Sequence, residues 1–237
     1  MLQTAQRVGV AIEGVTRILG GRRVLDELSL TVPEHGRVGI VGRSGAGKST
    51  LLSLVAGLDT PDAGSISVGL PDCALMPQRD CLLPWRTALD NACLALENRG
   101  IPSAEARRIA LPLFARLGLA GAEELLPAKL SGGMRQRVAF ARTLLADKRV
   151  LLLDEPFGAL DAITRSELQE WLAHALEDEP RTVLLVTHDV EEALLLCDRV
   201  LVLADGRIAA DFDVDVPRVR TDYGFVELRE RALEAIA

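Results

Sequence analysis

Residues 42–49 read GRSGAGKS, which fits the pattern G-x-x-x-x-G-K-[ST] of a phosphate-binding loop. Glycines in this pattern let backbone N–H groups surround phosphate oxygens, and the lysine ammonium reaches the terminal phosphates as a compact charge. The hydroxyl group after the lysine suits Mg²⁺, and the start of a helix adds the positive end of its dipole. The loop therefore predicts binding and hydrolysis of a nucleoside triphosphate, which we expect to be ATP. The predicted ligands are Gly42, Ser44, Gly45, Gly47, Lys48, Ser49 and Thr50.

Hydrolysis also needs a carboxylate that holds the metal and a base that orients the attacking water. Residues 150–155 read VLLLDE and offer both, because Asp154 would end a buried strand and Glu155 follows it directly. The alternative is that both carboxylates only cap the element that begins near Pro156. Since the same chain carries a phosphate loop, we predict Asp154 as a metal ligand beside Ser49, and Glu155 as the catalytic base.

A sheet must position these residues. The short, mostly apolar run at residues 37–41 leads directly into the phosphate loop, and a helical pattern follows it over residues 48–56. This context disfavours the alternative of a glycine-rich turn without a ligand. Further β-rich runs alternate with amphipathic helical segments, which predicts a parallel sheet. The remaining runs cover residues 150–153, 182–186 and 200–203, and helices are expected over 163–176 and 225–236.

Two regions show other patterns. Residues 8–12 and 28–32 alternate apolar and polar side chains, which predicts a small antiparallel β layer at the start of the chain. Residues 86–146 show only helical patterns, with capping candidates at Ser103 and Ser131. We therefore predict an α/β fold, a P-loop NTPase core with a mostly parallel sheet, an N-terminal antiparallel β layer and a helical subdomain insertion. The predicted parts of this single domain are the β layer and RecA-like core at 1–85 and 147–215, the helical subdomain at 86–146 and a short C-terminal helix at 216–237.

Bulk composition narrows the class of protein. The chain has 237 residues, of which 49% are hydrophobic, yet no apolar run approaches the roughly 18 residues that cross a bilayer. Residues 1–7 are polar and do not resemble a secretory signal, so we expect a cytoplasmic location. The net charge of -7 disfavours a nucleic-acid partner. The four cysteines lack C-x-x-C spacing, which argues against a zinc site or a disulfide framework.

A further motif makes the interpretation specific. Residues 130–137 read LSGGMRQR, in which Ser131, Gly132 and Gly133 would open a helix and turn free N–H groups toward an anion. The alternative is a capping serine without a ligand. This segment resembles the signature motif of ABC-type ATPases, and the resemblance extends over nearly the whole chain. It implies that the signature meets the γ-phosphate held by a second copy of the chain, in a head-to-tail dimer with two composite sites.

The resemblance also implies roles for three more residues. Gln78, in MPQ, matches the loop glutamine that senses Mg²⁺ and the attacking water, so it joins the predicted metal and catalytic residues. Asp161 lies in a loop that passes information between the two nucleotide sites. His188 matches the switch histidine that contacts the γ-phosphate, although a lone histidine after a strand is more often structural. With Lys48 and Glu155, the residues Gln78 and His188 complete the predicted catalytic set.

The resemblance finally implies a transport task. Residues 79–91 read RDCLLPWRTALDN and are similar to the nitrate, sulfonate and taurine class of importer ATPases, as is the segment 216–237. In that class this region docks a transmembrane permease, so Leu82, Leu83 and Trp85 would contact or support a permease helix. Ordinary packing is the alternative for Leu82 and Leu83. The implied protein is a peripheral ATPase at the cytoplasmic face of the membrane, which acts indirectly with a solute-binding protein.

One residue departs from the family pattern, and three other functions stay open. Leu19 stands where relatives usually place an aromatic ring against adenine, so we expect weaker discrimination between ATP and GTP. The alternatives are a non-transport ABC ATPase acting on chromosomes, DNA repair or ribosomes, an ATP-sensing module that does not hydrolyse, and an export ATPase. Long coiled coils are typical of the first class and are not predicted here.

Overall fold

The structure of the protein is a computed structural model that describes residues 8–68 and 73–236. The prediction that residues 1–7 carry no secretory signal lies outside these ranges. The described residues form two compact units: unit 1 holds residues 8–68, 73–75, 149–155 and 169–236, and unit 2 holds residues 76–148 and 156–168. No described helix combines the length and the apolar character that a membrane span requires. The limits of the predicted domain parts stay a prediction.

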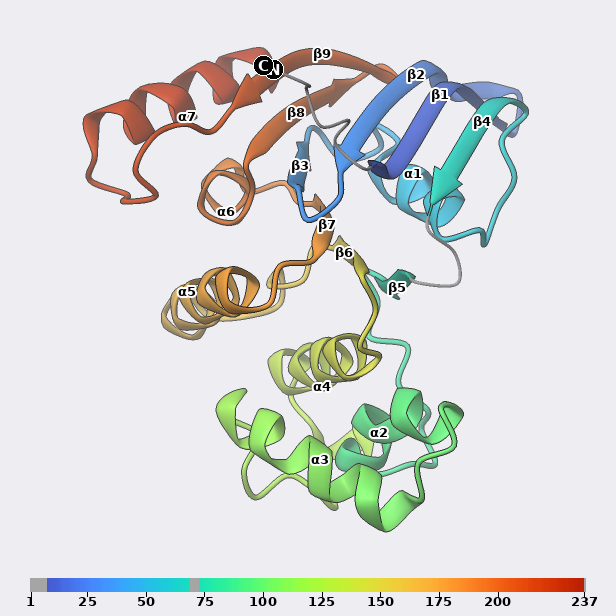
Figure 1. The fold of residues 1–237 in the computed structure, drawn as a ribbon, viewed down its shortest axis with the longest axis vertical. Helices are drawn as coiled ribbons and strands as arrows, with labels where there is room; N and C mark the ends of the chain where they lie inside the picture. The colour runs from blue at the N-terminus through green and yellow to red at the C-terminus, as the bar shows by residue number, and fades with distance from the viewer. Residues whose placement is uncertain (1–7, 69–72, 237) are drawn as a thin grey trace, which may run out of the picture. The chain divides into compact units, whose positions relative to one another are not determined.

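A six-stranded sheet organises unit 1, with the order β5-β6-β7-β3-β8-β9 (Figure 1). Strands β6, β7, β3 and β8 run parallel, and β9 closes one edge as an antiparallel strand. Every residue of β6 and β7 is buried, as expected for central strands covered on both faces. The predicted, mostly parallel sheet is confirmed. The bounds are β3 Arg37–Val41, β5 Cys73–Met76, β6 Val150–Asp154, β7 Thr182–Val186, β8 Arg199–Ala204 and β9 Arg207–Asp213.

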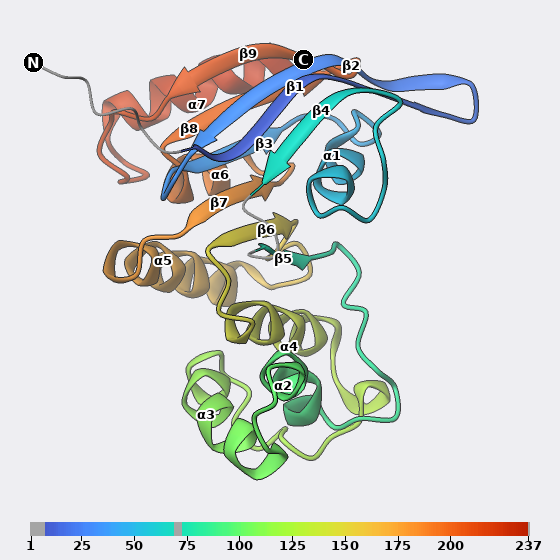
Figure 2. The same cartoon turned by 45° about the vertical axis from the view of Figure 1, so that its right-hand side comes forward.

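A second, antiparallel sheet belongs to the same unit, with the order β2-β1-β4 (Figure 2). Its strands are β1 (Val8–Leu19), β2 (Arg22–Pro33) and β4 (Ala63–Val68). Alternate residues such as Val10, Ile12 and Leu30 are buried in the core cluster of unit 1. This alternation places one face of the sheet on the core, and the predicted antiparallel β layer is confirmed.

Helices complete unit 1. They are α1 (Lys48–Val55), α6 (Val190–Leu196), α7 (Tyr223–Ile236) and the second half of α5 (Ala162–Asp178). Helix α6 packs closely against β3, because a Cβ atom added to Gly39 would lie only 2.9 Å from the Cβ of Ala193. Helix α7 contacts β8 and β9 and buries Phe225, Leu228 and Ala232. The apolar face of α7 therefore belongs to the core of unit 1.

The regular elements in the described residues of unit 2 are helices and one 3₁₀ turn, apart from Met76 at the end of β5. It contains α2 (Ala88–Asn98), α3 (Ser103–Arg116), the 3₁₀ turn η1 (Pro127–Lys129), α4 (Gly132–Leu145) and the first turns of α5. Helix α2 contacts both α3 and α4, and the rings of Phe140 and Phe157 meet edge to face at 5.4 Å. The helical insertion is confirmed.

One capping prediction in unit 2 is wrong. Pro102 occupies the N-cap position of α3, and no side chain caps this helix. Ser103 is instead the first helical residue, because the ring of Pro102 fixes an extended backbone immediately before it. The other candidate, Ser131, is an N-cap, since its hydroxyl accepts a hydrogen bond from the N–H of Met134 at 3.2 Å.

Candidate functional site

The predicted phosphate loop connects β3 to α1 in unit 1, and its glycines are required by close contacts. A Cβ atom on Gly42 would lie 2.2 Å from the carbonyl oxygen of Leu203. Gly47 has a φ of +104°, and a Cβ atom there would lie 2.8 Å from the carbonyl oxygen of Val24. Neither position can hold a side chain without moving the backbone of a neighbouring strand or turn. The glycines thus allow the loop to pass close to its neighbours.

Lys48 lies inside this loop. Its side-chain ammonium donates hydrogen bonds to the carbonyl oxygens of Gly42 at 2.7 Å and Arg43 at 2.9 Å. Burial lowers the pKa of Lys48, and the negative charges of Glu155 and Asp154 act in the opposite direction. Only 7% of the residue is exposed, so its positive charge is held at one fixed place. A partly desolvated cation enclosed by the loop can attract phosphate oxygens strongly.

Strand register brings three predicted residues to the same sheet edge. Val186 of β7 pairs with Asp154 of β6 on one side and with Ile40 of β3 on the other. Because all three strands run parallel, the segments that follow them leave the sheet side by side. These segments contain the phosphate loop, Glu155 and His188. The carboxyl edge of the sheet is therefore where the cation and the carboxylates of unit 1 gather.

Glu155 adopts an unusual backbone conformation at this edge. Its φ is +48°, in the left-handed region that side chains other than glycine seldom adopt. The N–H of Glu155 donates to the carbonyl oxygen of Val186 at 2.8 Å, which holds the turn against β7. Backbone strain of this kind costs about 1 kcal/mol or more and is concentrated at functional sites.

His188 contacts this glutamate. Its Nδ1 atom lies 3.3 Å from Oε1 of Glu155, and 63% of the His188 side chain is exposed. Asp154 is only 5% exposed and ends the fully buried strand β6. Unit 1 thus brings together Lys48, Asp154, Glu155 and His188. The same unit places Ser49 and Thr50 in the first turn of α1, where no side chain caps the helix.

The other predicted site residues lie in unit 2. Ser131 caps α4, followed by Gly132 and Gly133, and Asp161 caps the start of α5 by accepting a hydrogen bond from the N–H of Thr164 at 3.0 Å. This hydrogen bond lowers the pKa of Asp161. Gln78 follows β5 and is exposed. Because these residues belong to unit 2, their proposed meeting with a nucleotide rests on the family and not on distances to Lys48.

Two residues of unit 2 were missed by the sequence analysis. Gln136 is 7% exposed, and its side-chain oxygen accepts a hydrogen bond from the N–H of Ala159 at 2.6 Å. This bond ties the signature helix α4 to the loop that contains Asp161. Asn91 is fully buried and holds the segment that carries Trp85, as shown by four hydrogen bonds to residues 83–87. The DN pair that contains Asn91 is visible in the sequence, but its partners could not be inferred from it.

Two cavities of unit 1 differ in their relation to this site. One of about 490 Å³ adjoins the phosphate loop and is lined by Arg43, Ser44 and Gly45 together with Arg22 and Arg23. Arg22 pairs with Leu19 across the β1–β2 hairpin. A nucleoside attached to phosphates in the loop has space on this side.

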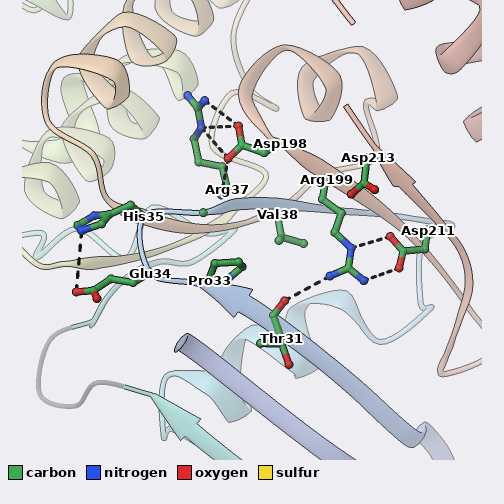
Figure 3. A pocket seen from close by; sticks show the side chains of 11 residues that line it. Thr31, Pro33, Glu34, His35, Arg37, Val38, Asp198, Arg199, Asp211 and Asp213 are labelled. Carbon is green, nitrogen blue, oxygen red and sulfur yellow. Dashed lines mark hydrogen bonds and ion pairs between the residues drawn. The ribbon is translucent and has the colours of Figure 1, made fainter. Parts of the chain in front are cut away.

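The other cavity, of about 800 Å³, lies at the opposite end of β3. It contains the ion pairs Arg37–Asp198 and Arg199–Asp211, and none of the predicted site residues lines it (Figure 3). It is therefore separate from the candidate site.

Known proteins resemble this chain over most of its length. A model of the family described as ABC transporter matches residues 25–158. The aliphatic sulfonates import ATP-binding protein SsuB 1 of Rhodococcus jostii is 46% identical over 236 residues, which cover 97% of this chain and 94% of that protein. The formylaminopyrimidine import ATP-binding protein ThiZ of Halalkalibacterium halodurans is 48% identical over 195 residues, covering 82% and 78%.

Solved structures of ATP-binding cassettes are also similar to this chain. The dimeric, post-hydrolysis structure of the ATP-binding cassette MJ0796 bound to ADP and Pi has a TM-score of 0.80 at 30% identity, and the match covers 88% of this chain and all of that one. The ATP-binding subunit of an ABC transporter has a TM-score of 0.81 at 26% identity, covering 96% and 99%.

Proposed function

We propose a transport function from one premise, which is that this chain belongs to the ABC transporter family. The chain is an ATP-hydrolysing subunit of that family, and its proposed task is to energise the import of a small solute. The observation that carries this proposal is the meeting of Lys48, Glu155 and His188 at the carboxyl edge of one sheet. A phosphate loop, a candidate base and a polar contact for that base are the parts that phosphate-bond hydrolysis requires.

In the proposed hydrolysis, Lys48, Glu155 and His188 each have a separate role. The ammonium of Lys48 would exchange its two carbonyl acceptors for oxygens of the terminal phosphates, which need a compact positive charge. The carboxylate of Glu155 would accept a proton from the attacking water, and it stays oriented because its N–H is bound to Val186. His188, in contact with Glu155, would donate to the γ-phosphate.

Mg²⁺ fits the oxygen groups of this site. Asp154 and Ser49 offer a carboxylate and a hydroxyl in unit 1, and hard oxygen ligands of this kind suit Mg²⁺. The resemblance to ABC-type ATPases supports Gln78 as a further proposed ligand. When bound, Mg²⁺ neutralises charge on the transferred phosphate. Lys48 and the phosphate loop bind and orient the rest of the nucleotide.

We further propose that two copies of the chain share each nucleotide. In this arrangement the phosphate loop of one copy faces Ser131, Gly132 and Gly133 of the other, and Asp161 connects the two sites. The solved cassette MJ0796, which resembles this chain, is a dimer bound to ADP and Pi, and this supports the proposal. The free N–H groups at the start of α4 favour an anion, since a helix start carries a partial positive charge.

The proposed partner in the membrane is a permease. Trp85 is 73% exposed and Leu82, three residues before it in the chain, is half-buried, which supports a contact through Trp85. Relatives are named as import proteins for aliphatic sulfonates and for formylaminopyrimidine. We therefore propose a peripheral subunit on the cytoplasmic side of the membrane. Its cargo would be a sulfonate-like or related small solute delivered by a solute-binding protein.

The loop assignment is tested by removing its cation. Lys48→Ala should lower the ATP turnover of the purified chain by about 100-fold or more, the scale observed when a charged transition-state contact is lost. The matched control is Lys148→Ala, because Lys148 lies before β6, at the end of the sheet opposite the phosphate loop. Measured phosphate release should be unchanged for the control. Wild-type turnover by Lys48→Ala would contradict the proposed function.

A further inference from the structure

We propose that Arg220 is a positioning residue for His188, acting through helix α6. The inference rests on the proposed catalytic role of His188 and concerns a part of the molecule that the proposed chemistry does not use. His188 lies in the short connection between β7 and α6, so its position depends on where α6 begins. The groups that hold the first turn of α6 therefore decide where the imidazole lies.

The start of α6 is fixed first by its own cap. The carboxylate of Asp189 accepts hydrogen bonds from the N–H groups of Glu191 at 2.9 Å and Glu192 at 3.2 Å. The N–H of Asp189 donates to the hydroxyl of Thr187 at 3.0 Å. His188 lies between these two residues, so a shift of the first turn of α6 moves its backbone directly.

The first turn of α6 is then joined to α5 by buried polar groups. Glu192 is 3% exposed, Gln169 of α5 is 2% exposed, and the amide of Gln169 donates to Oε2 of Glu192 at 3.3 Å. Buried polar groups are costly unless they are hydrogen-bonded, so this contact resists displacement. A movement of α6 relative to the second half of α5 would break it.

Arg220 closes this network from the C-terminal arm, which we define as residues 216–236. Its guanidinium donates to the side-chain oxygen of Gln169 at 2.9 Å and also bonds the carboxylate of Glu191. A third contact reaches Glu170 of α5 at 3.8 Å. One planar guanidinium thus joins two helices through two hydrogen bonds and one longer ion pair, which a single ammonium cannot do in the same way. Arg229 of α7 adds a 3.5 Å ion pair to Glu191.

The arm has an anchor of its own, so Arg220 is not needed merely to keep it folded. Helix α7 buries Phe225, Leu228 and Ala232 against unit 1, and it contacts β8 and β9. Arg218 fastens the arm to the other end of α6 through Asp198 and the carbonyl oxygen of Leu195. Unlike Arg218, Arg220 contacts the first turn of α6, beside His188, and it alone joins that turn to Gln169 among the hydrogen bonds of the described arm.

The test compares three variants of the full chain in which His188 is observed directly. The chain has 3 histidines, so the imidazole signals can be assigned by NMR with a His188→Gln variant. Arg220→Met should shift or broaden the His188 signal and leave the His35 signal unchanged, because His35 precedes β3 whereas His188 follows the carboxyl end of the parallel strand β7. It should also lower kcat for ATP by about 10-fold while KM stays within about twofold, as expected for a misplaced catalytic group.

Two further variants separate positioning from folding. Arg218→Met removes the same charge from the same arm but leaves the first turn of α6 fastened, so it should lower the melting temperature without moving the His188 signal. Arg220→Lys keeps the charge and should give a smaller shift of that signal in the same direction; it replaces the Met variant if the latter does not fold. An unchanged His188 signal in both Arg220 variants overturns the inference, as does an equal shift in Arg218→Met. The NMR signal of His188 is measured without ATP hydrolysis. If the wild-type chain did not hydrolyse ATP, that result would contradict the proposed function but not the positioning of His188 by Arg220.

Discussion

Asp198 concentrates several interactions in one carboxylate. It accepts hydrogen bonds from the N–H and the guanidinium of Arg37 (Figure 3). It also pairs with Arg218. Burial raises the pKa of Asp198, but the hydrogen bonds and charges of Arg37 and Arg218 outweigh this effect and leave the pKa below its usual value. A carboxylate with a lowered pKa stabilises the fold above its unfolded pKa and loses that contribution as the pH falls through its folded pKa.

We therefore expect Asp198→Asn to lower stability by about 0.5–1 kcal/mol at pH 7, because two guanidinium groups lose their charged partner while solvent screens the half-exposed carboxylate. The melting temperature should fall by roughly 1–4 °C for a chain of this size. The penalty should be constant from about pH 5 to 7 and shrink below about pH 4. Asp213→Asn, in the same cavity, is the control and should have little effect. If Asp198→Asn lowered the free energy of unfolding equally at pH 3 and pH 7, the charge of the Asp198 carboxylate would not contribute to stability.

Site residues could be predicted from the sequence where the residues that act together are close neighbours in the chain. The phosphate loop lies within 42–49, so its pattern could be recognised without knowing the fold. The contact between His188 and Glu155 needed the register of β6 and β7, and the bond between Arg220 and Gln169 joins residues 51 positions apart. Such pairs have no sequence signal of their own. The predicted effect of Leu19 on discrimination between ATP and GTP stays a prediction. The cavity beside the phosphate loop is lined by arginines, which would place cations beside a nucleoside bound there.

Helix α2 organises the segment that presents Trp85. The side-chain oxygen of Asn91 accepts from the N–H of Leu83 at 2.7 Å, and its amide group donates to three carbonyl oxygens, those of Leu83, Arg86 and Thr87. The hydroxyl of Thr87 caps the same helix by accepting from the N–H of Asp90. The loop and the helix are thus one hydrogen-bonded element.

We expect Asn91→Ala to destabilise the chain by about 2–4 kcal/mol, because it leaves several buried backbone groups without partners. Asn98→Ala is the matched control, since Asn98 lies exposed at the end of the same helix. Thermal unfolding should separate the two variants, and binding of the proposed permease should weaken only for Asn91→Ala. Equal stability of the two variants would mean that water replaces these hydrogen bonds at no cost.

Strands with a strong apolar or alternating pattern could be predicted, whereas two exposed edge strands could not. Strands β3, β6 and β7 are short apolar runs because they lie in the middle of the sheet. Strands β4 and β9 contain no fully buried residue, so they lack the apolar signal by which a strand is recognised in a sequence. Both lie at the edge of a sheet, where one side of the strand has no partner. Helix α5 was recognised from its amphipathic pattern despite passing from unit 2 into unit 1.

For the whole molecule, the central claim is a shared site. Lys48, Asp154, Glu155 and His188 belong to unit 1, whereas Gln78, the start of α4 and Asp161 belong to unit 2, and we propose that both sets act on the nucleotide. We propose that a second copy brings its own α4 to the nucleotide, which would make ATP itself part of the interface. Dimerisation should therefore depend on ATP and on slow hydrolysis, because release of the cleaved phosphate removes the group that both copies bind.

The most direct measurement is the mass of a Glu155→Gln variant in solution, with Mg²⁺ and with or without ATP. Replacing the carboxylate by an amide removes the proposed base while keeping its shape, so bound ATP should persist. By light scattering, the account predicts 25.5 kDa per particle without ATP and twice that mass with ATP. The additional change Lys48→Ala should abolish the shift. A Glu155→Gln chain that stays single when saturated with ATP would contradict the shared site.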